Sequence, residues 1–203
     1  DAFLFTGKFT IVSVILINVL AFALALALTK GIKGTNIFRT IFFMPNLIGG
    51  VVLGYVWKTL INCFLSIIGQ PLLALNSTAG YWGLIILMCW QQIGYMMIVY
   101  IAGLQSVPDS VIEAAEIDGA NAWKTLFKVK IPMVMSSVTV CLFLTLSNSF
   151  KLFDQNLALT NGQPYGKGKM TEMLALNIFN TFYARSGKVW KGYGPVSYTH
   201  LTL

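Results

Sequence analysis

Four long apolar stretches separated by short polar segments dominate the chain. They cover residues 9–29, 41–61, 82–104 and 133–150. A transmembrane helix needs about 20 mostly apolar residues, and continuous runs of this length are too long for the strands of a membrane barrel. The pattern therefore predicts an all-α membrane protein, with four spans in a single transmembrane domain over residues 1–203.

Composition and charge support the membrane class. Hydrophobic residues make up 56% of the chain and charged residues 10%, whereas a soluble domain has about 25% charged residues. The lysines lie mostly between apolar stretches, so the net charge of +7 reflects topology and not nucleic-acid binding. By the positive-inside rule, residues 30–40 and 105–132 are cytoplasmic, and the uncharged residues 62–81 are external.

The sequence lacks the residue patterns of several other classes. The three cysteines lie in or beside apolar stretches without metal-type spacing, and His200 is the only histidine. GKFT at Gly7 and GKGK at Gly166 are incomplete phosphate loops. No span offers paired acids, a Ser/Lys pair or metal ligands. We therefore expect no catalytic site, cofactor or metal, which argues against an intramembrane enzyme.

Residues 105–132 predict two short helices outside the membrane. Pro108 suits the first position of a helix, and Gly119 is a natural helix stop. Asn121 can cap a second helix, which Pro132 would close by restricting the residue before it.

One face of the second helix is aromatic. Trp123, Leu126 and Phe127 meet on that face because residues three and four apart are neighbours on a helix. A solvated connector is the plain alternative, but clustered exposed apolar side chains favour a docking surface.

The same segment resembles a known motif. Glu113, Ala114 and Ala115, followed by Gly119 and by VKIP ending at Pro132, resemble the EAA motif of inner-membrane permease subunits of binding-protein-dependent ABC importers. Val and Ile replace the usual Ile and Leu before the proline. FFMPNLIGGVVLGYVW, WQQIGYMMIVYIAGLQSVP and NSFKLFDQNLALTNGQP are similar to carbohydrate-type permeases related to the larger permease of the maltose system, and the likeness runs over residues 9–194.

The resemblance implies a fold, partners and a site. The fold would be that of a type I ABC importer permease in a bacterial inner membrane. Its partners would be a second permease, a cytoplasmic ATPase dimer, an extracytoplasmic solute-binding protein, a sugar and membrane lipid. The residues predicted to couple to the ATPase are Glu113, Ala114, Ala115, Asp118, Gly119, Trp123, Phe127 and Pro132.

The family has six spans in its core, so the four counted here predict a fragment. The chain begins at Asp1 without methionine, and residues 195–203 have no family counterpart that we identify, which suggests a non-native tail.

Polar residues within or at the ends of spans are candidates for a substrate path, because burial in a membrane is costly for them. They are Gln91, Gln92, Asn148, Ser149 and Lys151. Helix–helix hydrogen bonding is the alternative, and Lys151 could instead pair with Asp154. Gly50 and Gly54 form a G-x-x-x-G pair, which predicts close helix packing.

The leading interpretation is a sugar or oligosaccharide importer subunit. A permease for glycerol phosphate, a polyamine or an amino acid is the nearest alternative. A self-contained channel or a structural membrane protein would not explain the aromatic cytoplasmic segment.

Overall fold

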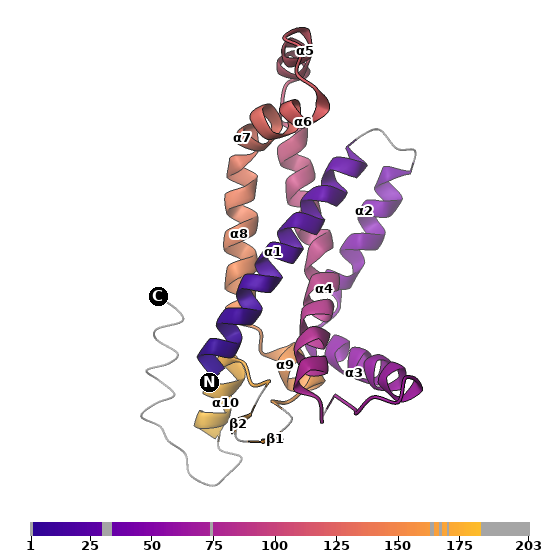
Figure 1. Ribbon diagram of the computed structural model, residues 1–203, viewed down its shortest axis with the longest axis vertical. Coiled ribbons are helices and arrows are strands. Elements are labelled where there is room, and N and C mark those ends of the chain that lie inside the picture. Colours follow the sequence, from indigo (N-terminus) through magenta and orange to yellow (C-terminus); the bar gives the residue numbers. More distant parts are fainter. Residues whose placement is uncertain are drawn as a thin grey trace. The chain divides into compact units, whose positions relative to one another are not determined.

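The computed structural model describes residues 2–29, 34–73, 75–162, 165–166, 168–169 and 171–183, and its regular structure is almost entirely helical (Figure 1). The 3₁₀-helix η1, the π-helix η2 and an antiparallel hairpin of β1 and β2 accompany the α-helices. The predicted tail at 195–203 lies outside the described residues. The elements are α1 (Ala2–Leu28), α2 (Thr35–Phe43), η1 (Met44–Leu47), α3 (Gly50–Ile67), α4 (Ser77–Gln105), α5 (Asp109–Ile117), α6 (Ala122–Thr125), η2 (Leu126–Lys130), α7 (Ile131–Met133), α8 (Met135–Phe150), α9 (Asp154–Leu159), β1 (Tyr165–Gly166), β2 (Gly168–Lys169) and α10 (Leu174–Tyr183).

Three described helices, α1, α3 and α4, are each long and apolar enough to cross a membrane. A fourth crossing is present if residues 122–150 count as one span, although this segment bends by 70° at its break before α8. The predicted stretches at 9–29, 82–104 and 133–150 fall largely on α1, α4 and α8.

The second predicted span, 41–61, is wrong as a single helix. The chain leaves α2 at Phe43, makes the 3₁₀ turn η1, and enters α3 only at Gly50. Pro45 has no N–H to continue the helical ladder, and Gly49 adopts an extended conformation with φ −59° and ψ 138°. α3 then runs six residues beyond the predicted end, to Ile67.

The chain divides into two compact units, which are described separately. The first comprises residues 1–13, 48–88 and 146–203, and the second comprises residues 14–47 and 89–145.

In the first unit, α3 packs closely on α9. A Cβ built on Gly54 would lie 2.4 Å from the Cβ of Ala158, and one on Gly50 would lie 2.9 Å from the Cβ of Asp154. No larger side chain fits at these contacts without a shift. The G-x-x-x-G pair therefore makes the close helix approach that its spacing predicts.

A buried amide ties α9 to the segment that leads into α10. Asn156 is fully buried, and its Nδ2 donates to the Thr171 carbonyl at 2.7 Å and to Thr160 Oγ1 at 3.0 Å. Its Oδ1 accepts the Met173 N–H at 3.0 Å. These bonds satisfy backbone groups that would otherwise be buried without partners.

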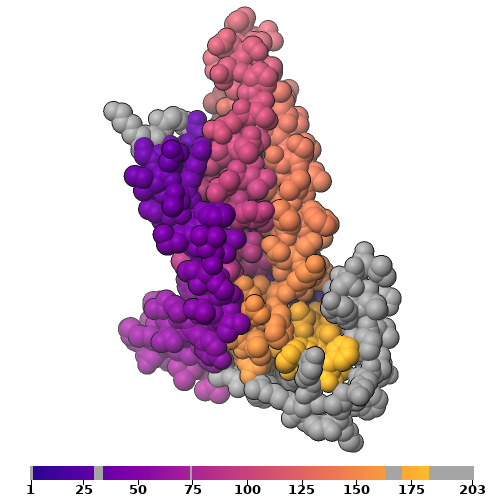
Figure 2. All heavy atoms as spheres, turned by 180° about the vertical axis from the view of Figure 1, so that it is seen from behind, coloured from indigo at the N-terminus to yellow at the C-terminus, as the bar shows by residue number. Residues whose placement is uncertain are grey.

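Several apolar side chains of α3 are exposed, and its atoms lie at the surface in Figure 2, in the colour that the bar gives to residues 50–67. Tyr55, Phe64 and Ile67 are among the side chains that contact little of this chain. In a membrane protein such a surface meets lipid or another subunit.

In the second unit, α4 approaches the backbone of α2 at a glycine. A Cβ on Gly94 would lie 1.7 Å from the Phe42 carbonyl oxygen, so this position accepts only glycine. A Cβ on Gly103 would lie 2.3 Å from Ser137 Oγ, at a contact between α4 and α8.

Replacing Gly54 with alanine should lower the thermal stability of the protein in detergent by overpacking the α3–α9 contact, with a cost of about 1–3 kcal/mol. Gly7→Ala is the matched control, because a Cβ at Gly7 in α1 meets no described residue within 4 Å apart from its chain neighbours and the backbone of its own helix. Equal melting temperatures for the two variants would contradict the packing argument.

Candidate functional site

The first helix of the charged segment, α5, ends in a glycine turn. Gly119 has φ +73°, and its N–H bonds to the Glu116 carbonyl at 3.0 Å, while the Ala120 N–H bonds to the Ala115 carbonyl at 2.9 Å. This pair of bonds is the Schellman motif, which satisfies the last helical carbonyls. The predicted stop at Gly119 is confirmed.

The beginning of α5 differs from the prediction by one residue. Pro108 is the N-cap, with φ −64° and ψ 137°, and Asp109 is the first helical residue. The extended ψ of Pro108 turns the chain from α4 into α5. Asp109 then places its negative charge at the positive end of the helix dipole.

The second helix begins as predicted and ends differently. Asn121 Oδ1 accepts the Lys124 N–H at 2.9 Å, which confirms the cap. Pro132 does not close the helix, because α7 continues to Met133 and the bend comes at Val134. Pro132 is the second residue of α7 and lies directly after the π-helical turn η2, within one continuous helical run.

Most residues predicted to couple to an ATPase lie on the surface. Trp123 and Phe127 are 69% and 59% exposed, and their rings stack with centroids 6.0 Å apart and an interplanar angle of 15°. Ala115 is half-buried. The other exposed members of the set are Glu113, Ala114, Asp118, Gly119 and Pro132.

Sequence reasoning missed Ile117. This side chain is 87% exposed at the end of α5, and it follows Glu113 by four residues and Ala114 by three. These three residues therefore share one face of the helix. The signal was present in the sequence, since Ile117 is apolar within an otherwise polar turn.

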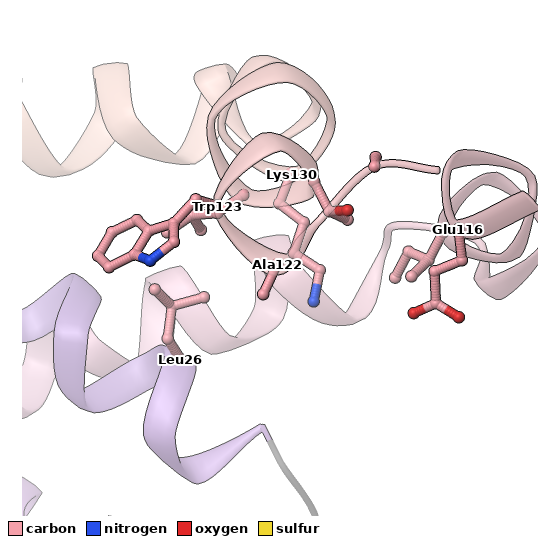
Figure 3. Close-up of a pocket in the computed structure, with 9 residues that line it drawn as sticks. Leu26, Glu116, Ala122, Trp123 and Lys130 are labelled. Atoms are coloured by element: carbon pink, nitrogen blue, oxygen red, sulfur yellow. The ribbon is translucent and has the colours of Figure 1, made fainter. Parts of the chain in front are cut away.

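A pocket of about 380 Å³ lies beside the charged segment (Figure 3). Leu26 of α1 and Trp123 form an apolar side, and Glu116 and Lys130 bring charges of opposite sign. Lys130 and Leu26 also line a neighbouring pocket of about 620 Å³ that reaches Asp109. The segment is thus hollowed on the side that faces the end of α1.

The residues predicted for a substrate path fall in both units. In the second unit, Gln91 is 6% exposed and Gln92 is half-buried, both on α4. In the first unit, Ser149 is fully buried and its Oγ lies 3.8 Å from Met88 Sδ. Asn148 is half-buried, and Lys151 is exposed just after α8. Within each unit the members are near neighbours in the chain, and their role stays a prediction.

Sequence reasoning did not identify a buried polar cluster in the second unit. Asn18 Oδ1 accepts the Tyr100 hydroxyl at 2.7 Å, and its Nδ2 donates to Thr145 Oγ1 at 3.0 Å and to the Val14 carbonyl at 2.8 Å. Asn18, Tyr100 and Thr145 are each less than 10% exposed. One amide therefore links α1, α4 and α8 through hydrogen bonds.

The apolar helices define a multi-pass membrane protein. Residues 17–190 match the family described as the binding-protein-dependent transport system inner membrane component, and the chain belongs to this family.

Curated relatives of the chain include several permeases. It is 44% identical over 193 residues to the probable starch degradation products transport system permease AmyD of Thermoanaerobacterium thermosulfurigenes, covering 91% of this chain and 64% of that protein. It is 30% identical over 184 residues to the multiple sugar-binding transport system permease MsmF of Streptococcus mutans, covering 87% of this chain and 62% of that protein. The chain thus spans less than two thirds of the length of these relatives.

Solved structures show the same fold. A crystal structure of a bacterial ABC transporter involved in the import of the acidic polysaccharide alginate matches with a TM-score of 0.78 at 18% identity, covering 99% of this chain and 75% of that chain. The fold is therefore that of an ABC importer permease.

Replacing Tyr100 with phenylalanine should destabilise the protein modestly, by about 0.6–1.7 kcal/mol, because a hydrogen bond between membrane helices is lost. Thermal melting in detergent measures the effect. Tyr95→Phe on the same helix is the control, since Tyr95 is half-buried and belongs to no part of this cluster. A drop of equal size in both variants would show that the bond to Asn18 contributes nothing.

Proposed function

We propose that this chain is a permease subunit of an ATP-driven importer of sugars or oligosaccharides. The relatives named for starch degradation products and for multiple sugars support this substrate class. The observation that carries the coupling role is the exposed face of α5 next to the Gly119 turn, because a helix that contacts little of its own chain is free to receive a partner.

The short connections from α5 to α4 and toward α8 suggest how a movement of the partner would be transmitted to the membrane helices. α5 follows the end of α4 after three residues, and the Schellman turn fixes its exit toward the helix that enters α8. A partner that moves α5 would therefore displace both α4 and α8 at their cytoplasmic ends. Short, hydrogen-bonded connections transmit such a displacement better than a flexible linker would.

The partner at this face would be a cytoplasmic ATPase, and Glu113, Ala114 and Ile117 would make its central contact. Two small residues at Ala114 and Ala115 let a groove approach the helix backbone closely. A second permease, an ATPase dimer and an extracytoplasmic solute-binding protein would complete the importer. One structural neighbour is an alginate transporter in complex with a periplasmic protein bound to alginate pentasaccharide, which supports this arrangement.

The substrate would pass the polar residues at the end of α8. Amides and hydroxyls offer both donors and acceptors, as sugar hydroxyls require, and Asn148 and Ser149 supply them. Gln91 and Gln92 are the corresponding candidates on α4. Glycerol phosphate, a polyamine or an amino acid is the alternative substrate.

Gly119→Leu in the full-length subunit should leave membrane insertion intact and uncouple ATP hydrolysis from uptake. Leucine resists the positive φ that the turn requires, so the exit of α5 would change. Gly69→Leu is the matched control, because Gly69 follows the C-cap of α3 with φ +69°, and a Cβ at either glycine meets no described residue within 4 Å apart from its chain neighbours. Uptake and ATPase stimulation that survive Gly119→Leu would refute the docking role.

Asn148→Ala should reduce uptake of the transported sugar about tenfold, since a lost hydrogen bond to a substrate that is otherwise buried costs about 1–2 kcal/mol. ATP hydrolysis without substrate should stay unchanged. Asn36→Ala on α2, an exposed amide, is the control. Uptake assays with malto-oligosaccharides, glycerol phosphate, spermidine and amino acids decide the substrate class, and a preference for a non-sugar would reject the sugar assignment.

A further inference from the structure

The helix that follows the Gly119 turn has an unusual direction. Residues 122–133 meet α8 at 70°. Membrane helices tilt by about 20° on average from the bilayer normal. If α8 crosses the membrane, residues 122–133 therefore lie close to the membrane plane, at the level where α8 enters it. Figure 1 shows this turn of the chain from α7 into α8.

The charge on this helix has one sign. Lys124, Lys128 and Lys130 lie on it, and no Asp or Glu occurs anywhere from Gly119 to Phe153. The acids of the segment are confined to α5 and its C-cap. Lys124 and Lys128 are both exposed and are four residues apart, so they project from one side of the helix.

An aromatic row runs beside the basic row. Trp123 and Phe127 precede the two lysines by one position each, and their stacked rings are mostly exposed. Trp and Lys together are typical of the membrane–water interface, where a ring enters the headgroup region and an ammonium group stays at the surface. A basic helix with an aromatic face parallel to the membrane fits an anionic lipid surface.

The pocket beside Trp123 supplies a place for one lipid. Its apolar side, Leu26 and Trp123, suits the upper part of an acyl chain, and Lys130 at its edge suits a phosphate (Figure 3). Glu116 lies at the α5 side of the same pocket and would repel a phosphate there. The headgroup would therefore sit toward the lysines and away from α5.

We propose that residues 122–133 form an anionic-phospholipid-binding helix, in which Lys124, Lys128 and Lys130 hold the headgroup phosphates while Trp123 and Phe127 enter the interface. The inference rests on the proposed orientation of the segment, with residues 105–132 in the cytoplasm. It deepens the proposed function by giving the two helices of the segment different partners, a protein for α5 and lipid for residues 122–133. Trp123 and Phe127 are thereby assigned to lipid and not to the ATPase contact that the sequence predicts.

Quenching of Trp123 by brominated lipid tests the proposal. The full-length subunit, purified with its partners in mild detergent, is titrated with brominated phosphatidylglycerol or brominated phosphatidylcholine. The difference between the wild type and Trp123→Phe isolates the signal of this tryptophan. We expect half-maximal quenching at a much lower concentration of phosphatidylglycerol than of phosphatidylcholine.

Two double variants distinguish the loss of positive charge on residues 122–133 from an equal loss of positive charge elsewhere in the protein. Each lysine at an anionic surface contributes about fivefold in affinity, so K124Q/K128Q should raise the half-quenching concentration of phosphatidylglycerol about 25-fold. K8Q/K58Q removes the same charge elsewhere and should change it little. Both variants are compared at equal yield and melting temperature.

Three results would overturn the proposal: equal quenching by the two lipids, equal effects of the two double variants, or Trp123 shielded from lipid whenever the ATPase is bound. The last result would show that the aromatic row is part of the protein interface. Because quenching requires neither sugar nor ATP turnover, a failure here is distinguishable from a failure of the uptake assays.

Discussion

Close approach of backbones at glycines is the constraint on which the helix packing depends. Lipid tails are as apolar as the side chains that face them, so helices in a membrane gain little from hydrophobic burial and rely on contact and hydrogen bonds. Gly54 against Ala158 and Gly94 against the Phe42 carbonyl are contacts of this kind, one in each unit. A methyl group at either position would push the paired elements apart.

The polar groups inside the helices contribute to packing through hydrogen bonds. Asn18 and Asn156 each use both ends of one amide to join segments distant in the chain. A buried amide with all of its bonds made is stable, whereas one that loses a partner leaves an unsatisfied group. Asn18 therefore fixes which helices pack together, Asn156 holds the segment before α10 against α9, and glycines set how closely helices pack.

Local signals in the sequence were enough to predict the charged segment. Gly119 and Asn121 act through bonds within a few residues of themselves, so the stop and the cap could be read directly. The break at Pro45 and Gly49 was missed because the apolar run over 41–61 masks it. The partners of Asn18 could not be predicted, since Tyr100 and Thr145 are 82 and 127 residues away. Ile117 could have been singled out as an apolar residue in a polar turn, but its exposure depends on the tertiary structure.

The distribution of charge gives the two helices of the segment opposite characters. All three acids between Glu113 and Asp118 precede the Gly119 turn, and all three lysines follow it. A single surface for one partner would have no need for this separation. The hydrogen-bonded Gly119 turn lies between an acidic helix and a basic one. An anionic membrane surface would repel the acidic helix α5 and attract the basic helix that follows the turn. Electrostatics would then set the angle at which α5 is presented to its partner, and the Schellman turn would preserve that angle when the partner moves.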